Sequence, residues 1–400
     1  MKISVALTTY NGEPYLEAQL RSIAEQTRPP DEMVVCDDGS KDQTLAILEA
    51  FAASAPFPVR IIRNEANLGS TRNFEKASLL CTGEAIAFSD QDDVWLPEKL
   101  ALCEAALEAN PNAGLVFTDA TVVDRELNPL GYTMWQAVLF NAERQRRLTH
   151  GEAMEVLMER NVVTGACMMF RAAMCDLIVP FSNLWVHDAW IAMLISLFYD
   201  LTIVPEPLML YRQHGSNQIG IVLPVEYMPH DDKAQRDLHD DAQKVRGDIE
   251  DSLREVKKPG LFKRVSRTKF RDPFRLRAMY EQFGPICDRM IEFDKTHRTK
   301  DRYRMFLGFM AHAKARGYLP QSRRQRLPII LREIFLLRYH RFSPGGILPF
   351  GLSIALADIL WDTLIDEKDS LWAKHNRLVW QQAARGEFLR LTDQADKSRV

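Results

Sequence analysis

Three carboxylates lie within four positions of this 400-residue chain, at Asp90, Asp92 and Asp93. They directly follow the apolar run at residues 85–88, which is typical of a buried strand. Like charges packed at the end of a strand repel one another unless a cation neutralises them. Oxygen ligands in such a cluster suit Mg²⁺ or Mn²⁺, ions that usually share their coordination with a phosphate. The cluster therefore predicts a metal–diphosphate site on an α/β sheet.

Alternating strands and helices must position this cluster. Strands are expected at 3–7, 33–36, 59–62, 85–88 and 115–118, and helices at 14–26, 44–53, 69–80 and 97–108. This order predicts a Rossmann-like, mostly parallel sheet, in which ligands bind beyond the carboxyl ends of the strands. Tyr10, Asp38, Asn67 and Asp90 all fall at such ends, so we expect them to converge on one cleft.

The pattern changes after residue 120. A hairpin turn is expected at 128–131, helices at 149–159 and 187–198, and strands at 166–170, 201–204 and 208–212. After about residue 222 the strand signal fades, and helices with Pro and Gly breaks at 259–260, 320 and 344–346 are expected. The chain is therefore predicted to contain an α/β domain at 1–222 and a mostly helical region at 223–400.

Several motifs in the first part occur in an order that resembles a known family. They are TTYN at 8–11, QT at 26–27, VVCDDGSKDQT at 34–44, NLG at 67–69 followed by RN at 72–73, SDQDDVWL at 89–96 and HDAW at 187–190. Together they resemble a family 2 glycosyltransferase, in the form found in bacterial rhamnosyltransferase-like members. The resemblance covers roughly residues 1–220. It implies the GT-A nucleotide-sugar-binding fold for the catalytic domain at 1–222, with residues 223–400 as a helical extension.

The resemblance also implies roles for particular residues. Asp188 is expected to be the catalytic base of an inverting transfer, because the acceptor hydroxyl must lose a proton as it attacks the anomeric carbon. The nucleotide-sugar site is expected to include Thr8, Tyr10, Asn11, Asp38, Asn67, Arg72, Asp90 and Arg212. Mg²⁺ or Mn²⁺ is expected at Asp92, Asp93 and His214. Which of the three Asp residues at 90–93 binds the ion stays open.

Each of these positions also has a purely structural interpretation. Asp38 lies in an Asp-Gly-Ser turn, and Asp188 can cap the helix that follows it. The acidic cluster can be a solvated loop at a helix start, and residues 211–217 an ordinary surface loop.

Charge divides the chain sharply. Residues 1–253 carry 20 Lys and Arg against 38 Asp and Glu, a net charge of −18, whereas residues 254–345 carry 24 against 8, a net charge of +16. Basic clusters at 257–258, 263–264, 323–326 and 338–341 alternate with apolar runs such as 327–337, a pattern that suits an anionic membrane surface. The alternatives are pairing with the acidic domain, within one chain or in a homo-oligomer, and a solvated helix face. No nucleic-acid-reading motif accompanies the basic charge, so no nucleic acid partner is expected.

The remaining features suggest a location. The six scattered cysteines form no CxxC pair, as expected of free thiols in a reducing compartment. No signal peptide and no uninterrupted apolar run long enough to span a bilayer is visible. We therefore expect a cytoplasmic protein, peripheral on the inner face of the cell membrane.

These observations lead to one main hypothesis. The chain is expected to move a sugar from a nucleotide-diphosphate donor, dTDP-rhamnose or a UDP-sugar, to a saccharide or lipid-linked acceptor of a cell-surface polysaccharide. A nucleotidyltransferase is a second hypothesis, but the loop at 8–12 lacks the Lys or Arg that a triphosphate site needs. A non-catalytic, membrane-associated scaffold is a third.

Overall fold

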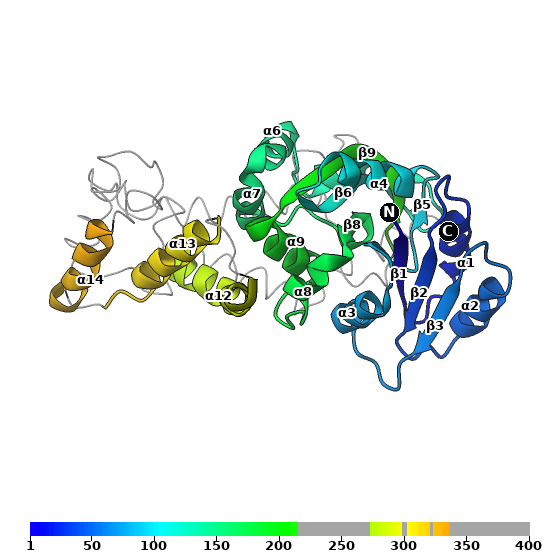
Figure 1. Ribbon diagram of the computed structural model, residues 1–400, viewed down its shortest axis with the longest axis horizontal. Helices are drawn as coiled ribbons and strands as arrows, with labels where there is room; N and C mark the ends of the chain where they lie inside the picture. Colours follow the sequence, from blue (N-terminus) through cyan, green and yellow to red (C-terminus); the bar gives the residue numbers. More distant parts are fainter. Residues whose placement is uncertain (215–272, 298–301, 321–322, 337–400) are drawn as a thin grey trace, which may run out of the picture. The chain divides into compact units, whose positions relative to one another are not determined.

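The computed structural model describes residues 1–214, 273–297, 302–320 and 323–336 (Figure 1). The chain divides into two compact units, Met1–Tyr227 with Arg289–Lys300, and Met228–Asp288 with Asp301–Val400. Several predicted features lie outside the described residues. They are residues 215–217 of the predicted loop at 211–217, the basic clusters at 257–258, 263–264 and 338–341, and the breaks at 259–260 and 344–346.

One sheet of nine strands organises the first unit. The strands are β1 (Ile3–Thr9), β2 (Glu32–Asp37), β3 (Val59–Arg63), β4 (Ala85–Ser89), β5 (Val94–Trp95), β6 (Ala113–Val123), β7 (Pro129–Thr133), β8 (Met168–Arg171) and β9 (Asp200–Arg212). Their order is β3-β2-β1-β4-β8-β6-β9-β5, and β7 pairs with β6. The pairings give β1, β2, β3, β4, β6 and β9 a common direction, while β5, β7 and β8 run the other way. The prediction of a mixed α/β fold with a mostly parallel sheet is confirmed.

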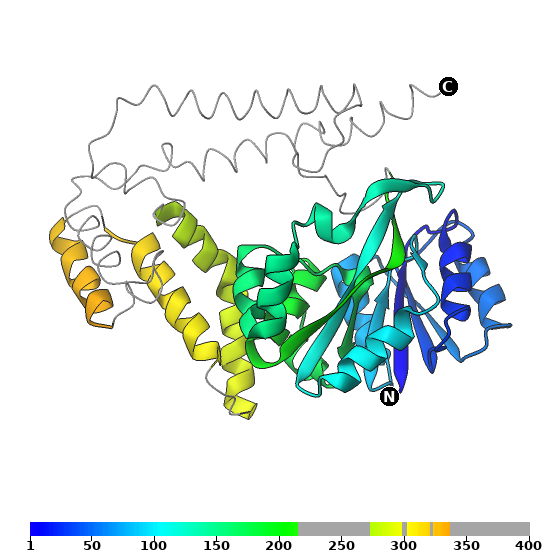
Figure 2. The same ribbon diagram turned by 90° about the horizontal axis from the view of Figure 1, so that it is seen from above.

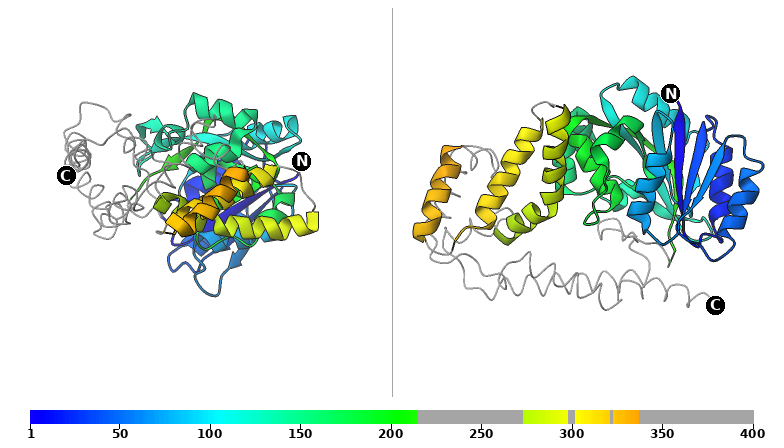
Figure 3. Two further views of the ribbon diagram at one scale, coloured as in Figure 1. Left: turned by 90° about the vertical axis from the view of Figure 1, so that its left-hand side faces the viewer. Right: turned by 60° about the horizontal axis from the view of Figure 1, so that its bottom comes forward.

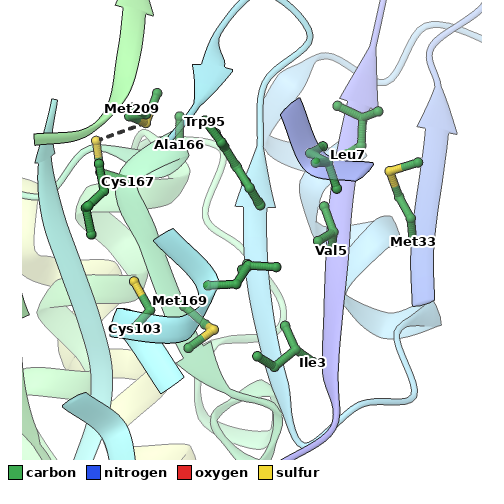
Figure 4. Packing of buried hydrophobic residues seen from close by; sticks show 14 of the residues in the cluster. Ile3, Val5, Leu7, Met33, Trp95, Cys103, Ala166, Cys167, Met169 and Met209 are labelled. Carbon is green, nitrogen blue, oxygen red and sulfur yellow. Dashed lines mark hydrogen bonds between the residues drawn. The ribbon is translucent and has the colours of Figure 1, made fainter. Parts of the chain in front are cut away.

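Helices cover both faces of this sheet. They are α1 (Leu16–Ala24), α2 (Thr44–Ala52), α3 (Ser70–Leu80), α4 (Lys99–Ala109), α5 (Met134–Ala137), α6 (Ala142–Arg147), α7 (Ala153–Glu159), α8 (Cys175–Ile178) and α9 (His187–Phe198). Alternate residues of a strand point to opposite faces. Ile3, Val5 and Leu7 of β1 therefore share one core with apolar residues of α1, α2 and α4 (Figure 4). On the other face, Phe74 of α3 stacks on Phe88 of β4 with ring centroids 4.5 Å apart.

Two elements differ from the sequence predictions for local reasons. The strands expected at 201–204 and 208–212 form one strand, β9, which pairs alongside β6 with irregular register (Figure 2). The helix expected at 149–159 begins at Ala153, because Gly151 adopts a φ of 93° that no helix contains. The predicted hairpin turn at 128–131 does connect β6 to β7.

Three further helices are described in the C-terminal part. They are α12 (Pro273–His297), α13 (Arg302–Gly317) and α14 (Arg323–Phe335), coloured yellow to orange in Figure 3. The last part of α12 belongs to the first unit, where Arg289 donates to the Leu177 carbonyl at 2.8 Å. In the second unit, His312 of α13 and Glu333 of α14 form a buried pair at 3.0 Å. Within the described residues, no helix is long and apolar enough to cross a bilayer.

Candidate active site

A cavity of about 830 Å³ opens at the carboxyl ends of β1, β2 and β4. Tyr10, Asp38, Asn67 and Asp90, which the sequence placed at strand ends, line it together. The lining residues are Thr8, Thr9, Tyr10, Asp38, Asn67, Gly69, Ser70, Asn73, Asp90, Gln91, Asp92, Met134, Ala137, Val138, Asn161, Val163, Thr164, Gly165, Val186, His187, Asp188, Ala189 and Tyr211.

Asp38 organises one side of this cavity. Its buried carboxylate accepts hydrogen bonds from the backbone N–H groups of Leu68 and Gly69 at 2.7 and 2.8 Å. The Asn64 amide donates a third bond at 2.8 Å. A carboxylate has about four acceptor positions, so one remains for a further donor. Asp38 therefore fixes the loop before α3 and still presents an acceptor at the cavity.

Gln91, the residue inside the acidic cluster, was not predicted as a site residue. Its Oε1 accepts from the Tyr10 N–H at 2.8 Å, and its Nε2 donates to the Tyr10 carbonyl at 3.0 Å. A Cβ at position 12 would collide with the Gln91 side chain, so Gly12 gives the glutamine its room. This amide pair ties the acidic loop to the end of β1. The pairing depends on two segments 81 positions apart, and no local pattern reveals it.

The three carboxylates of the acidic cluster occupy different environments. Asp90 and Asp92 line the cavity, whereas Asp93 is 1% exposed and does not. Asp93 Oδ1 accepts from the Arg212 N–H at 3.1 Å, and its Oδ2 is buried with no hydrogen-bond partner among the described residues. Burial, and then the charges of Asp92 and Asp188, raise the pKa of Asp90 to about 7. Burial and the charges of Asp92 and Asp90 also raise the pKa of Asp93. The surroundings therefore disfavour the ionised forms of Asp90 and Asp93, and a bound cation would favour them.

The end of β9 meets this cluster. His214 Nε2 lies 2.9 Å from Asp92 Oδ2, and its ring stacks on Tyr15 with centroids 4.5 Å apart. The Arg212 Nε donates to the Asp92 carbonyl at 2.7 Å, and its guanidinium lies 5.0 Å from the centre of the Tyr15 ring. Tyr15, which the sequence analysis did not single out, thus orients both residues. Arg212 is not among the residues that line the cavity; it holds the backbone of the acidic loop.

The structure brings the predicted ligands of a divalent cation together only in part. In the described residues no group of three or more His, Cys, Asp or Glu side chains surrounds a common point. Asp92 and His214 do converge, and Asp90 faces the same cavity. Mg²⁺ and Mn²⁺ bound to a nucleotide often use only one or two protein ligands, because phosphate oxygens and waters complete the shell. Asp92 and His214 therefore fit a shared metal–diphosphate site and not a closed protein cage.

Asp188, the second residue of α9, also lines the cavity. Its carboxylate accepts from the Asn161 amide at 3.1 Å, from the Gly165 N–H at 3.2 Å and from the Ala189 N–H. Burial raises its pKa to about 6, although these hydrogen bonds oppose the shift. A carboxyl with this pKa is ionised at neutral pH and is a stronger base than an exposed carboxylate.

Its neighbour His187 is buried and packs 4.5 Å from the Phe74 ring. Burial lowers the pKa of His187 to about 4, so the imidazole is neutral near pH 7. A Cβ at position 165 would lie 2.5 Å from His187 Nε2, so glycine is required there. The HDAW motif is thus anchored by the histidine, while the aspartate faces the cavity.

Of three other predicted residues, one lines the cavity and two hold the loops and the helix around it. Thr8 lines the cavity, but Asn11 and Arg72 do not. Asn11 Oδ1 accepts from the Lys41 N–H at 2.9 Å, which joins the loops after β1 and β2. Arg72 donates to Asn183 at 2.9 Å and pairs with Glu75 at 2.7 Å. Asn73, beside Arg72 in the same motif, lines the cavity instead, since the helical turn at the start of α3 points neighbouring residues in different directions.

The cavity also has an apolar wall. Met134, Ala137 and Val138 from α5 and the residue after it, with Val163 and Val186, contribute this surface. Asp119 holds α5 in place by accepting from the Trp135 N–H at 2.9 Å. One cavity thus combines carboxylates, amides and a patch suited to the apolar face of a sugar ring.

The acidic side chains and hydrogen-bonding loops lie at the carboxyl ends of parallel strands, which is where open α/β sheets bind their ligands. Residues 4–176 match the family described as Glycosyl transferase family 2. The match of this segment agrees with the resemblance that the motifs predicted, and the observed mixed α/β sheet is the GT-A fold expected for it.

Individual proteins are similar to this chain over part of its length or at low sequence identity. An uncharacterized glycosyltransferase of Nostoc sp. is 39% identical over 100 residues, which are 25% of this chain and 31% of that protein. A dTDP-rhamnosyl transferase of Shigella flexneri is 27% identical over 224 residues, 54% of this chain and 73% of its own. The crystal structure of Staphylococcus aureus TarS residues 1–349 with UDP-GlcNAc aligns over 90% of this chain and 89% of its own, at 15% identity and a TM-score of 0.43. The chain thus spans less than a third of the length of the Nostoc relative.

Proposed function

We propose that this chain is an inverting, metal-dependent glycosyltransferase that uses a nucleotide-diphosphate sugar. One observation carries the proposal. The Asp188 carboxylate, held by three N–H donors, lines the same cavity as the acidic pair Asp90 and Asp92. A base and an acidic, phosphate-side cluster in one cavity are what a direct sugar transfer needs.

Asp188 is the proposed base. It takes the proton of the acceptor hydroxyl while that oxygen bonds to the anomeric carbon and the bond from that carbon to the diphosphate breaks. The transition state has oxocarbenium character, so the carboxylates that line the cavity also stabilise its positive charge. A single displacement of this kind inverts the configuration at the anomeric carbon.

Asp92 and His214 are the proposed ligands for Mg²⁺ or Mn²⁺. When bound, the ion would neutralise the charge that develops on the leaving diphosphate. Asp93, the third expected ligand, is 1% exposed and is proposed to hold the end of β9 by accepting from the Arg212 N–H. Arg212 is proposed to support the site by holding the acidic loop.

The nucleotide is proposed to lie between Tyr10, Asp38 and Asn67. The free acceptor position on Asp38 suits an imide N–H of a pyrimidine base. Thr8, Asn73 and Asp90 would contact the ribose or sugar, whereas Asn11 and Arg72 would shape the surrounding loops. A dTDP-sugar is the preferred donor, since the Shigella relative is named a dTDP-rhamnosyl transferase.

Calorimetric titration with dTDP and UDP, with and without Mn²⁺, tests this function directly. We expect Mn²⁺-dependent binding of at least one of the two, and release of the nucleoside diphosphate when the matching sugar nucleotide and a saccharide acceptor are supplied. A chain that binds neither nucleotide would overturn the proposal. Turnover of a nucleoside triphosphate to pyrophosphate would show a nucleotidyltransferase instead.

The acceptor is proposed to be a saccharide, carried on a lipid at an anionic membrane surface of the cytoplasmic side. Leu327, Leu331 and Phe335 recur at every fourth position of α14 and are 39%, 52% and 83% exposed. Residues 254–345 around this stripe carry a net charge of +16, which complements anionic lipid.

Vesicle co-sedimentation tests this part. The full chain is expected to pellet with vesicles that contain phosphatidylglycerol and not with pure phosphatidylcholine. Leu331→Ser/Phe335→Ser should weaken the binding, while the matched control Leu79→Ser, at another exposed leucine on α3, should not. Equal binding of all three proteins would exclude α14 as the docking face.

A further inference from the structure

A network of buried side-chain amides contacts Asp38. Asn64, the residue after β3, is 4% exposed, and its Nδ2 donates to Asp38 Oδ1 and to Asn73 Oδ1, both at 2.8 Å. Its Oδ1 accepts from the Lys76 ammonium at 2.8 Å. Asn73 is buried as well and donates to the Cys36 carbonyl at 2.8 Å. The network thus joins the end of β2, the residue after β3 and helix α3.

The two ends of this network fix the direction of each hydrogen bond in it. The Lys76 ammonium can only donate, and the Cys36 carbonyl can only accept. The lysine therefore turns the oxygen of Asn64 toward itself and leaves the amide hydrogens for Asp38 and Asn73. The carbonyl turns the NH₂ group of Asn73 toward β2 and leaves its oxygen for Asn64. Flipping either amide would set one acceptor against another, which is costly in a buried place.

This fixed direction determines which acceptor position of Asp38 stays open. Oδ1 accepts from the Asn64 amide and, at 2.7 Å, from the Leu68 N–H, so both of its acceptor positions are used. Oδ2 accepts from the Gly69 N–H at 2.8 Å and from no other group of the described residues. Asp38 lines the cavity, so a ligand there meets a carboxylate with one open position, on Oδ2.

Asn64 itself is held by the backbone and lies outside the main cavity. Its N–H donates to the Asp37 carbonyl at 2.8 Å, which fixes the residue beside the end of β2. It is not among the residues that line the cavity of about 830 Å³; it lines a smaller one of about 540 Å³, which it shares with Asp38. A ligand in the main cavity would therefore feel Asn64 through Asp38.

We propose that Asn64 is a positioning residue that directs the open acceptor of Asp38 toward the nucleotide, while Lys76 and Asn73 fix the direction of its amide. The inference rests on the proposed function for its effect on nucleotide binding. Its effect on the loop before α3 requires no ligand, because the same carboxylate holds Leu68 and Gly69.

Hydrogen–deuterium exchange on the full chain tests the positioning without any ligand. Asn64→Ala removes one partner of Oδ1 and lets the Asp38 carboxylate turn, so the Leu68 and Gly69 amides should exchange about tenfold faster. Amides of α9 should exchange as in the parent, because the change is local. Asn112→Ala, at an exposed asparagine between α4 and β6, is the matched control and should alter neither. Unchanged exchange at Leu68 and Gly69 in Asn64→Ala would overturn the proposal.

Calorimetry with UDP, dTDP and CDP in the presence of Mn²⁺ tests the effect on recognition. Asn64→Ala should weaken binding of UDP or dTDP about tenfold and that of CDP less, since cytosine has no imide N–H for the open acceptor. In an Asp38→Ala background, Asn64→Ala should cost at most about twofold, because the residue through which it acts is gone. Equal losses in both backgrounds would show direct contact between Asn64 and the nucleotide and would overturn the positioning role.

Lys76→Met is a milder variant that keeps both asparagines. It removes only the ammonium that fixes the Asn64 oxygen, so amide exchange at Leu68 and Gly69 and nucleotide dissociation constants should rise about threefold. Lys76→Arg retains a donor and should restore both values. A Lys76→Met chain that matches the parent in both measurements would overturn the role given to the lysine.

The outcomes distinguish this inference from the proposed function. A parent chain that binds none of the three nucleotides would overturn the proposed function, and amide exchange at Leu68 and Gly69 would still decide for or against the positioning of Asp38. Faster exchange with unchanged nucleotide affinity in Asn64→Ala would overturn the link to recognition while the glycosyltransferase proposal stands.

Discussion

The two sides of the cavity use carboxylates in opposite ways. On the side proposed for the nucleotide, Asp38 accepts three hydrogen bonds and fixes the loop before α3. On the acidic side, Asp90 and Asp93 crowd against Asp92 in a buried place, and the pKa of both is raised. A carboxylate whose oxygens accept several hydrogen bonds holds its loop in one conformation. Crowded carboxylates without such partners are stabilised when a cation binds. The comparison predicts that mutations on the first side change nucleotide affinity and those on the second change catalysis.

Asp188→Asn is expected to have the largest effect. The amide keeps the shape and some hydrogen bonds of the side chain but cannot accept the hydroxyl proton, so kcat should fall by about 10²–10⁴-fold. Nucleotide affinity should stay unchanged, because Asp188 is not among the residues proposed to hold the nucleotide. Transfer rates measured together with calorimetric affinities check both statements, and full transfer activity in the variant would remove Asp188 as the base.

Asp38→Ala should act mainly on binding. It removes the carboxylate that accepts from the partly buried N–H groups of Leu68 and Gly69, and a hydrogen bond to a charged group is worth about 1.5–3 kcal/mol. We expect nucleotide affinity to fall about tenfold to a hundredfold and the melting temperature to drop. Asp42→Ala, at another loop carboxylate beyond the cavity, is the matched control. A change in kcat alone would contradict the division between the two sides.

The pH dependence should report on the proposed base, Asp188. Since burial raises the pKa of Asp188 to about 6 and the base must be ionised, kcat/KM should fall about tenfold per pH unit below 6 and level off above it. Circular dichroism over the same range would show that the fold persists. A rate that stays constant from pH 5 to 8 would speak against a carboxyl base at this position.

Gln91→Ala should have the smallest effect of the four. It breaks the two bonds to the Tyr10 backbone that join the acidic loop to β1, and each is worth about 0.5–1.5 kcal/mol. The KM for the donor should rise several-fold, with a smaller change in kcat. Gln91→Glu keeps the acceptor for the Tyr10 N–H and loses the donor to the Tyr10 carbonyl. Its KM should therefore lie between that of the parent and that of Gln91→Ala. A larger effect on kcat than on KM would place Gln91 in the chemistry itself.

Much of the fold could be predicted because its signals are local. The apolar runs that became β1, β2 and β4, and the polar residues directly after them, are contiguous in the sequence, and parallel strands bring their carboxyl ends together. Local motifs also indicate the family without reference to the tertiary structure. They are the motifs at 8–11, 34–44, 67–69 and 187–190. The boundaries of β9 and α7 were missed because pairing with β6 and a left-handed glycine at 151 decided them.

The sequence by itself determined which residue types stand at the strand ends, and so the class of fold and the kind of site. Tertiary structure decided how those residues divide the work: Asp90 and Asp92 face the cavity, Asp93 is buried, and Asn73 takes the place expected for Arg72. It also brought Gln91 and Tyr15 to the site, and their partners lie far away along the chain. The physical reason is that charge and hydrogen bonding act over a few ångströms in space, and only packing sets which distant residues come that close.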